Sequence, residues 1–598
     1  MYFWASRKSH IKKIQFTSKL LWLSPHFSDN DGDFCIEIFM HCTLRVTWAA
    51  GLGINSLADI IGNMITHLGY HVIWDLEYES RIKWGTNWFD LNISSDRPTL
   101  RSTLDVLIAF DLAGLKRSIS SLRDGGYIIM NAKHKEKFTP EIQEIINIKG
   151  LNLLTLEIAD KYENTYLLGI LVKLLGIDPS LVEAEIREVF RKKWEEVILK
   201  NVDIVKNILA TFTLTAESPW QLTKIEGPKK DFTYGNKLIA LGATDSGLEY
   251  YSAYPMTPAS TVLTEIIATG KVTYLQAEDE IAVINSALGA AFTWARAMVG
   301  TSGGGFALMT EALSFAAQAE FPITVILSQR AGPSTGTPTF HEQGDIHFAL
   351  HPTFGEFGHV VLYPSSHEEA YLFAGLAQNI ASKYQTIVIL LTDKQFSELH
   401  RSYDPLPPPT PIDRGKIIQS PAPDYKRYAL TEDHVSPYVR VGTESGDFIA
   451  TSYEHDEYGA TSEDPDMKAK MTIKRAHKLD DFFEKEGIRG YEMVNGDAKK
   501  IIVTISANRI VAEDFIADNP EYGLMVVKFL LPLDARIRSE LVWKDEVIFM
   551  ENNYTWQLED HLVKSLELRN IAGLTIANFR KYTLYPFYRE DLDARFKK

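Results

Sequence analysis

Cysteine is nearly absent from this sequence, whose 598 residues include only Cys35 and Cys42. An iron–sulfur cluster normally takes four thiolate ligands, and the chain has no Cys-x-x-Cys pair. If this protein takes part in electron transfer through such a cluster, another chain must carry the cluster. The two cysteines could pair in a disulfide, but reduced thiols are favoured in an intracellular enzyme.

Long apolar runs are also missing. No uninterrupted apolar segment reaches the roughly 20 residues that cross a bilayer, so a membrane partner is not expected. Basic residues near the N-terminus precede an apolar run at 20–23, but this run is too short for a signal peptide and no clean cleavage site follows. Because clear α/β patterning begins only after Met40, we interpret residues 1–42 as an extension ahead of the true start and expect a cytoplasmic protein.

An excess of basic charge is the third absence. The formal net charge is −16, whereas a nucleic-acid-binding protein needs a clustered basic surface to neutralise phosphates. A nucleic acid is therefore not an expected partner. The remaining composition, with 45% hydrophobic and 23% charged residues, is that of a soluble protein, and the length is sufficient for several domains.

A first α/β domain is predicted over residues 43–214. Apolar residues recur at helical spacing from Ile54 to Leu68, between two apolar runs that are rich in β-branched residues. The later runs continue a parallel α/β sheet. The strands are predicted at 44–49, 70–74, 104–110 and 127–130.

A second α/β domain is predicted over residues 235–400, with strands at 323–327 and 386–392. The proline-rich stretch at 405–411 then predicts a stiff extended linker, because proline favours extended backbone and lacks an amide donor. It lies in a segment of long loops, 401–495, that is expected to end in charged helical sequence.

The last domain is predicted over residues 496–598. Buried-type apolar runs alternate there with helical sequence, which favours a small parallel sheet. Its strands are predicted at 501–505, 525–530 and 546–550.

Four motifs between residues 254 and 338 are together typical of one half of a thiamine-diphosphate site, the half that holds the pyrimidine ring. The diphosphate half is missing, because its signature is Gly-Asp-Gly, and the Gly-Asp pairs at 344, 446 and 496 do not continue into a second glycine. A protein with only the pyrimidine half should not work alone. The motifs are Tyr-Pro-Met-Thr-Pro at 254–258, Gln-Ala-Glu-Asp-Glu at 276–280, Thr-Ser-Gly-Gly-Gly at 301–305 and Gln-Arg-Ala-Gly-Pro-Ser-Thr-Gly at 329–336.

The order and spacing of these motifs resemble the alpha subunit of 2-oxoacid:ferredoxin oxidoreductases, of the type with a gamma domain fused in front of the alpha domain. The resemblance runs from about Leu44 to the C-terminus. It implies a multidomain α/β protein with a gamma-type domain, a pyrimidine-binding domain and a transketolase C-terminal-like domain. Further matching motifs lie at 234–236, 242–243, 339–345, 454–459, 551–555 and 581–586.

This resemblance also implies an activity and its partners. The reaction would be coenzyme-A-dependent oxidative decarboxylation of a 2-oxoacid, such as pyruvate or 2-oxoglutarate, to acyl-coenzyme A and carbon dioxide, with reduction of ferredoxin. Thiamine diphosphate would be shared with a beta subunit that carries Mg²⁺ and a 4Fe–4S cluster. No metal ligands are expected in this chain, and the preferred 2-oxoacid stays open.

Glu278 is the expected catalytic residue. It lies between a predicted strand at 272–276 and a small-residue helix at 281–291, and α/β folds place ligands at the carboxyl ends of strands. By resemblance its carboxylate bonds the pyrimidine ring, which favours the imino form of the cofactor in a dry pocket. The alternative is that all acids at 278–280 merely favour a helix N-terminus. Glu280 is expected to be such a first-turn charge.

Thr257 and Arg330 are the expected substrate-binding residues. Two prolines fix the turn that presents Thr257, and a guanidinium is the natural bidentate partner of a 2-oxoacid carboxylate. Both roles are implied by the resemblance, which also places Tyr254 and Pro255 at the cofactor. Alternatively, Arg330 forms a surface salt bridge, and Thr257 or Ser260 caps a helix.

Other motifs have weaker interpretations. The loop at 301–305 is expected to allow close backbone approach at the cofactor or the subunit boundary, although a packing turn would explain it as well. The motif at 454–459 is interpreted as a family loop without metal ligation. Trp556 stands where the family often has glycine, which affects local packing.

Two rival functions remain. The Gly-Leu-Gly turn at 51–53, with Asp75 as a ribose-binding acid, would suit a nicotinamide-dependent dehydrogenase, but the third glycine is missing and the other motifs stay unexplained. Related gamma domains usually have a more glycine-rich turn. A non-catalytic paralogue is the second rival, although Thr257, Glu278 and Arg330 are intact.

Overall fold

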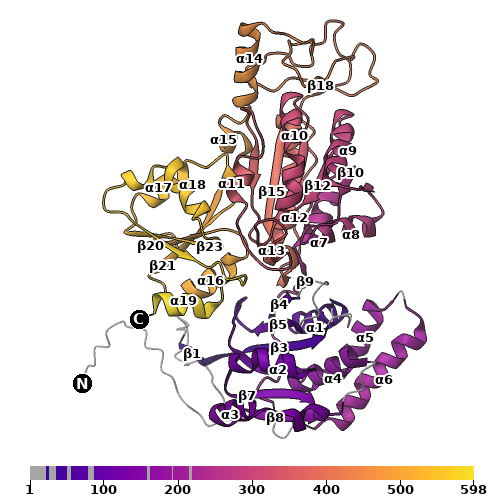
Figure 1. Cartoon of the computed structure of the whole chain (residues 1–598), viewed down its shortest axis with the longest axis vertical. Coiled ribbons are helices and arrows are strands. Elements are labelled where there is room, and N and C mark those ends of the chain that lie inside the picture. The colour runs from indigo at the N-terminus through magenta and orange to yellow at the C-terminus, as the bar shows by residue number, and fades with distance from the viewer. Residues whose placement is uncertain are drawn as a thin grey trace. The chain divides into compact units, whose positions relative to one another are not determined.

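The computed structural model describes residues 22–25, 36–49, 55–78, 86–157, 162–191, 193–213 and 218–597. They belong to two compact units, one made of residues 1–232 and 400–405, the other of residues 233–399 and 406–598 (Figure 1). Cys35 and the Gly-Leu-Gly turn at 51–53 lie outside the described residues. None of the helices in the described ranges has the length and apolar character to cross a membrane.

The first unit is built on an eight-stranded sheet with the order β8-β7-β6-β3-β5-β4-β16-β9. Its strands β3, β6, β7 and β8 pair in parallel, and the first three are the predicted strands at 44–49, 104–110 and 127–130. The strands are β3 (His41–Ala49), β4 (His71–Glu77), β5 (Thr86–Ser94), β6 (Leu104–Ala109), β7 (Leu122–Asn131), β8 (Asn152–Leu156), β9 (Asp231–Tyr234) and β16 (His400–Tyr403).

The extension of this parallel order to residues 70–74 is wrong. Those residues form β4, which runs antiparallel to β5, and β5 in turn runs antiparallel to β3. The sequence analysis missed β5, although Phe89, Leu91 and Ile93 alternate with polar residues along it. This alternation is typical of a strand with one exposed face, but here the polar Asp90 and Asn92 are buried as well.

Helices cover both faces of this sheet. One face packs with α1, α4, α5 and α6 in a core that includes Leu44, Ile61 and Val202. The other face packs with α2 and α3 around residues such as Leu107 and Ile142. The helices are α1 (Asn55–His67), α2 (Leu112–Ser118), α3 (Pro140–Lys149), α4 (Glu163–Leu175), α5 (Pro179–Val189) and α6 (Glu195–Thr211).

The second unit contains a seven-stranded sheet with the order β11-β10-β12-β13-β15-β14-β22. All neighbouring strands are parallel except the last pair, β14 and β22. The predicted strands at 323–327 and 386–392 are the fully buried β13 and β15. The strands are β10 (Tyr250–Ala253), β11 (Thr273–Gln276), β12 (Ala297–Thr301), β13 (Ile323–Gln329), β14 (Val360–Leu362), β15 (Ile387–Asp393) and β22 (Phe529–Leu531).

Two groups of helices flank the seven-stranded sheet (Figure 1). One face packs with α9 and α10 in a large apolar core. On the other face α7 packs closely on α12, since a Cβ at Gly242 would overlap the carbonyl of Tyr371. The carboxyl ends of the parallel strands therefore open onto one shared edge. The helices are α7 (Gly235–Asp245), α8 (Ser260–Thr269), α9 (Glu280–Phe292), α10 (Gly303–Gln318), α11 (Ile346–Leu350), α12 (His367–Tyr384) and α13 (Lys394–Glu398).

The C-terminal part folds around a five-stranded sheet with the order β19-β21-β20-β23-β24, in which only the edge strand β19 is antiparallel to its neighbour. It shares one apolar core with the seven-stranded sheet. The charged helical sequence expected at the end of the segment 401–495 stops with α15 at Glu486, and β19 begins at Tyr491. The elements are α15 (Phe482–Glu486), β19 (Tyr491–Val494), β20 (Lys500–Thr504), α16 (Asn508–Asp518), β21 (Tyr522–Val527), α17 (Arg536–Leu541), β23 (Glu546–Glu551), α18 (Gln557–Ser565), β24 (Thr575–Arg580) and α19 (Arg589–Phe596).

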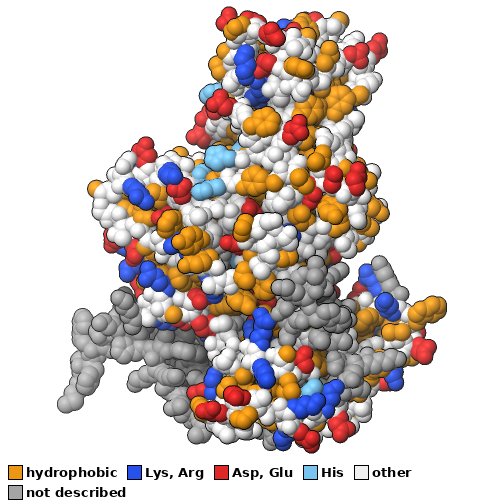
Figure 2. All heavy atoms as spheres, in the orientation of Figure 1, with side chains coloured by type: hydrophobic (Ala, Val, Ile, Leu, Met, Phe, Trp, Pro, Cys, Tyr) orange, Lys and Arg blue, Asp and Glu red, His pale blue; other side chains and the backbone are white. Residues whose placement is uncertain are grey.

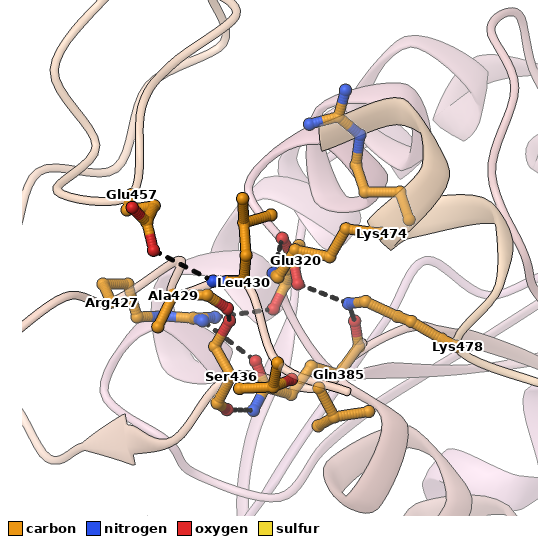
Figure 3. A network of polar contacts seen from close by, with 12 residues as sticks. Glu320, Gln385, Arg427, Ala429, Leu430, Ser436, Glu457, Lys474 and Lys478 are labelled. Atoms are coloured by element: carbon orange, nitrogen blue, oxygen red, sulfur yellow. Dashed lines mark hydrogen bonds and ion pairs between the residues drawn. The ribbon is translucent and has the colours of Figure 1, made fainter. Parts of the chain in front are cut away.

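A buried ionic network fastens the long loops to the seven-stranded domain (Figure 3). Glu320, at the end of α10, is fully buried and binds Lys474 of α14 (Pro465–Ala476) and also Lys478, at 2.5 Å. Arg427 donates to the carbonyl of Glu320 at 3.0 Å and to Gln385 at 2.9 Å. Burial alone would raise the pKa of Glu320, but the surrounding cations hold it below its usual range.

Candidate active site

Arg330 and Thr257, the two predicted substrate-binding residues, lie together in the structure. Arg330 follows β13, Thr257 follows β10, and the Arg330 Nη1 donates a hydrogen bond to the Thr257 carbonyl at 2.8 Å. Arg330 is half-buried, and its guanidinium binds a backbone carbonyl. This contact differs from the surface salt bridge that was the alternative for Arg330. Burial lowers the pKa of Arg330, and the charges of Asp345 and Glu280 oppose that shift.

Thr257 does not cap the following helix. The N-cap of α8 is Ala259, and no side chain caps that helix. In the described part of the chain, the Thr257 hydroxyl has no hydrogen-bond partner. It is half-buried, while Tyr254 and Pro255 at the start of the same turn are exposed. The alternative of a structural cap is therefore wrong, and the hydroxyl is available to a ligand.

The acids at 278–280 have three different surroundings. Glu278 lies between β11 and α9, as predicted, and its side chain is exposed. Asp279 is the N-cap of α9 and accepts a hydrogen bond from the Ala282 amide at 2.7 Å. The helix-terminus explanation therefore holds for Asp279, whereas Glu278 remains exposed at the strand end.

Glu280 is buried, which the sequence analysis did not foresee. Its exposed fraction is 3%, and its Oε1 has no hydrogen-bond partner in the described part of the chain. It lies against the first turn of α10, where a Cβ on Gly305 would overlap the Glu280 carboxylate. Glu280 is thus an interior carboxylate rather than a simple first-turn charge.

A second carboxylate reaches the same helix end. A Cβ on Gly303, the first residue of α10, would lie 2.6 Å from Asp345 Oδ2. A glycine-rich helix N-terminus normally suits a phosphate group, but here Glu280 and Asp345 already supply negative charge. The expected close approach at 301–305 is therefore made by the chain's own carboxylates, and an approach of the cofactor stays a prediction.

Glu342 and Asp345 are site residues that the sequence analysis missed. Both belong to the motif at 339–345, which was noted only as part of the resemblance. Burial and the nearby Glu342 raise the pKa of Asp345 to about 6, and Arg330 acts against this rise. Burial also raises the pKa of Glu342, although the Gly332 amide donates to its Oε2 at 3.0 Å.

Gln343 lies in this loop and ties it to the C-terminal part by hydrogen bonds. Its amide donates to the Asn552 carbonyl at 2.7 Å, and its Nε2 donates to Asp393 at 2.9 Å. Asn553 Nδ2 donates to the Gln343 carbonyl at 3.2 Å. Hydrogen bonds therefore join the motif at 339–345 to the motif at 551–555.

The remaining motifs have structural contacts. Glu454 accepts two hydrogen bonds from Arg475, at 3.0 and 2.8 Å, and so ties the loop at 454–459 to α14. Trp556 has a φ of +53°, a conformation that favours glycine, and Arg580 lies 4.4 Å from its ring centroid. This explains why a glycine would suit the position.

Comparison with known proteins shows the family to which this chain belongs. The family model described as pyruvate flavodoxin/ferredoxin oxidoreductase, thiamine diP-bdg, matches residues 242–474, and the pyruvate ferredoxin/flavodoxin oxidoreductase model matches residues 43–210. The chain is 30% identical to the 2-oxoacid:ferredoxin oxidoreductase subunit alpha of a Sulfolobus species, over 92% of this chain and 96% of the relative. It is 34% identical to the 2-oxoglutarate oxidoreductase subunit KorA of Mycobacterium tuberculosis, over 51% of each chain.

One solved structure is similar over nearly the whole chain. It is the 2-oxoglutarate:ferredoxin oxidoreductase from Magnetococcus marinus with 2-oxoglutarate, coenzyme A and succinyl-CoA bound, at 28% identity and a TM-score of 0.82, covering 93% of this chain and 99% of that chain. The fold and the strand-end site define a member of the thiamine-diphosphate-dependent 2-oxoacid oxidoreductases. The chain belongs to the family of 2-oxoacid:ferredoxin oxidoreductase alpha subunits, which confirms the resemblance and the expected α/β fold class.

Proposed function

We propose that this chain is the substrate-binding half of a coenzyme-A-dependent 2-oxoacid:ferredoxin oxidoreductase that works only with a beta subunit. The observation that carries the proposal is the Arg330–Thr257 hydrogen bond at the carboxyl edge of the sheet. It brings together a cation and a hydroxyl-bearing residue that follow β13 and β10, two strands of the same sheet separated only by β12, at the carboxyl edge where α/β folds bind ligands. Family membership supports a 2-oxoacid as the substrate.

Each residue then has a chemical role. The guanidinium of Arg330 binds the substrate carboxylate, because a planar fork of N–H donors matches two carboxylate oxygens. The Thr257 hydroxyl donates to the 2-oxo oxygen. Glu278 accepts a hydrogen bond from the pyrimidine ring of the cofactor, against which Tyr254 and Pro255 pack. Thiamine diphosphate, when bound, supplies the carbanion equivalent that such a decarboxylation needs.

The residues present fit only part of that cofactor. The strand ends offer an exposed glutamate and apolar groups for a ring, whereas Glu280 and Asp345 fill the helix end that would suit a phosphate. We therefore assign the diphosphate site, its Mg²⁺ ion and a 4Fe–4S cluster to the beta subunit, which would pass electrons to ferredoxin.

Exposed apolar side chains on the turn after β10, on β11 and on helices α9 and α10 support such a partner. All four residues of the edge strand β11 are exposed, and hydrophobic side chains lie on the surface where Figure 1 places α9 and α10 (Figure 2). An apolar patch rimmed by polar groups is typical of a protein interface. The partner would cover Glu278 and give it the dry surroundings that its role requires. The exposed residues are Tyr254 at 40%, Tyr274 at 49%, Leu275 at 41%, Ile281 at 51% and Leu308 at 50%.

Co-expression with a beta-type subunit tests the proposal. The purified complex should reduce ferredoxin or a dye in a reaction that needs coenzyme A and a 2-oxoacid, and a panel of 2-oxoacids would identify the substrate. Activity should require both chains and should collapse in Glu278→Gln. A stable complex that contains thiamine diphosphate but is inert toward every acid would favour a non-catalytic paralogue. Failure to bind any such partner would overturn the proposal. A cytoplasmic location stays a prediction.

A further inference from the structure

The cation that we assign to the substrate is surrounded by acids. Asp345 and Glu280 both lie against the first turn of α10, where a Cβ on Gly303 or Gly305 would overlap their carboxylates. The Asp345 amide donates to Gln329, the neighbour of Arg330, at 2.8 Å, and Glu342 accepts from the Gly332 amide two residues after Arg330. The charges of Asp345 and Glu280 act on Arg330, and that of Glu342 acts on Asp345. These acids come from two parts of the chain, since Glu280 begins α9 whereas Glu342 and Asp345 lie in the loop before α11. With all three ionised, this group carries more negative than positive charge before any substrate arrives.

A bound 2-oxoacid adds one more carboxylate to this group. The group would then hold four carboxylates and one guanidinium, and carboxylates that share a partly buried site disfavour one another's ionisation. A proton is therefore favoured on one of them. The same physics applies wherever carboxylates share a site.

Asp345 is the best acceptor for that proton. Asp345 begins the turn into α11 but makes no side-chain cap to that helix, whereas Glu342 accepts the Gly332 amide at 3.0 Å. The charges that act on Asp345 are Glu342 in its own loop and Arg330 at the end of β13. The next ionisable group, His347 on α11, is paired with Asp560 at 3.6 Å. On the side of α10, Asp345 lies against Gly303, which has no side chain that could donate a hydrogen bond.

We propose that Asp345 is a positioning residue which takes up one proton from solvent when a 2-oxoacid carboxylate binds Arg330. The inference rests on the proposed function of Arg330. The proton forms an O–H bond on the Asp345 carboxylate, and no substrate bond breaks in this step. When the substrate carboxylate has left as carbon dioxide, the excess charge is gone and the proton returns to solvent. The raised pKa of free Asp345, about 6, agrees with this role.

The KM of the reconstituted complex for its best 2-oxoacid tests this coupling between pH 6 and 8.5. Only the enzyme with protonated Asp345 binds substrate well, so KM should rise by up to about tenfold per pH unit above pH 6, while kcat stays nearly constant. Asp345→Asn is isosteric and cannot ionise, so its KM should be independent of pH. Asp497→Asn, at an exposed residue, should behave like wild type.

A second variant keeps the test meaningful if Asp345→Asn does not fold. Glu342→Gln removes the negative charge beside Asp345 but keeps an acceptor for the Gly332 amide. The variant should therefore shift the pH at which KM begins to rise. Because loss of Glu342 lowers the pKa of Asp345, the rise should begin at lower pH. An unchanged profile in this variant would count against the proposal.

Calorimetry gives a readout that does not depend on turnover. Binding of oxamate, an unreactive pyruvate analogue, in two buffers of different ionisation enthalpy should show uptake approaching one proton at pH 7 in wild type and close to none in Asp345→Asn. Proton uptake in a complex without turnover would keep this inference and overturn the proposed activity. An active complex with a flat KM profile and no uptake would overturn this inference alone. A complex that binds neither oxamate nor any 2-oxoacid of the panel would overturn both.

Discussion

Arg330 and Thr257 stand 73 positions apart in the sequence, yet the Arg330 Nη1 lies 2.8 Å from the Thr257 carbonyl oxygen. One donor of the guanidinium is thereby used to fix its direction, and the others remain for a ligand, because arginine has five N–H donors. The same bond fixes the turn that carries the Thr257 hydroxyl. A single contact therefore orients both groups that we assign to the substrate.

Replacement of this arginine should weaken substrate binding. In the complex with its beta subunit, Arg330→Lys keeps the charge but loses the planar fork, so KM for the 2-oxoacid should rise about 10- to 100-fold, which corresponds to about 1.4–2.8 kcal/mol. Steady-state kinetics measures this effect. Arg440→Lys, at an exposed position, should leave KM unchanged. An equal KM in both variants would remove Arg330 from the substrate site.

The hydroxyl of Thr257 can be separated from its backbone role. Thr257→Ser keeps the hydroxyl and the carbonyl that Arg330 binds, so kcat/KM should stay within a few-fold of wild type. Thr257→Val keeps the shape but removes the donor, and kcat/KM should fall about 10- to 100-fold. Equal activity of the two variants would show that only the carbonyl matters.

Glu278 should affect activity without affecting stability. Its side chain is exposed in this chain, so Glu278→Gln should change the free energy of unfolding by less than about 0.5 kcal/mol. Turnover of the complex should nevertheless fall by at least about 100-fold if the carboxylate acts on the cofactor. Thermal melting of the isolated chain and activity of the complex measure the two effects.

Glu280→Gln provides the comparison and should alter mainly KM, because Glu280 acts on Arg330. A larger loss of kcat in Glu280→Gln than in Glu278→Gln would mean that Glu280, and not Glu278, acts on the cofactor.

Two adjacent glycines offer a matched test of the crowded helix end. A Cβ at Gly305 would overlap Thr301 Oγ1 and the Glu280 carboxylate, whereas a Cβ at Gly304 meets nothing within 4 Å. Gly305→Ala should therefore lower the free energy of unfolding by about 1–3 kcal/mol. Gly304→Ala should be neutral or stabilising by up to about 1 kcal/mol, because alanine favours the helix. Chemical denaturation distinguishes them, and equal stabilities would contradict the burial of Glu280.

The buried network around Glu320 should dominate the stability of the second unit. Glu320→Gln leaves Lys474 and Lys478 without their anion but keeps the backbone carbonyl that Arg427 binds, and the loss should cost about 3–5 kcal/mol. Because the pKa of Glu320 is lowered in the folded chain, its contribution is complete at pH 7 and is lost only as the pH falls below the ordinary glutamate value of about 4.3.

Denaturation at pH 7 and pH 4 checks the size and the direction of this effect. Glu463→Gln, at an exposed glutamate in the same long-loop segment, provides the control and should match wild type. A Glu320→Gln chain as stable as the control would mean that the cations are solvated in the folded state.

Local sequence determined much of the site. The apolar runs before Glu278 and Arg330 are strands, and the residues that follow a strand in an α/β fold lie at the carboxyl edge of its sheet. The position of both side chains at that edge therefore followed from short-range patterns. The absence of a second glycine after the Gly-Asp pairs at 344, 446 and 496 likewise pointed to a partner.

Tertiary structure alone decided which acids surround the substrate arginine. Glu280 follows Glu278 by two residues, but Glu280 is buried against Gly305 of α10, whereas Glu278 lies exposed between β11 and α9. Asp345 reaches Gly303 through a loop whose path is set by hydrogen bonds to Asn552 and Asn553. Such contacts depend on packing between segments far apart in the chain, which local hydrophobic periodicity does not encode.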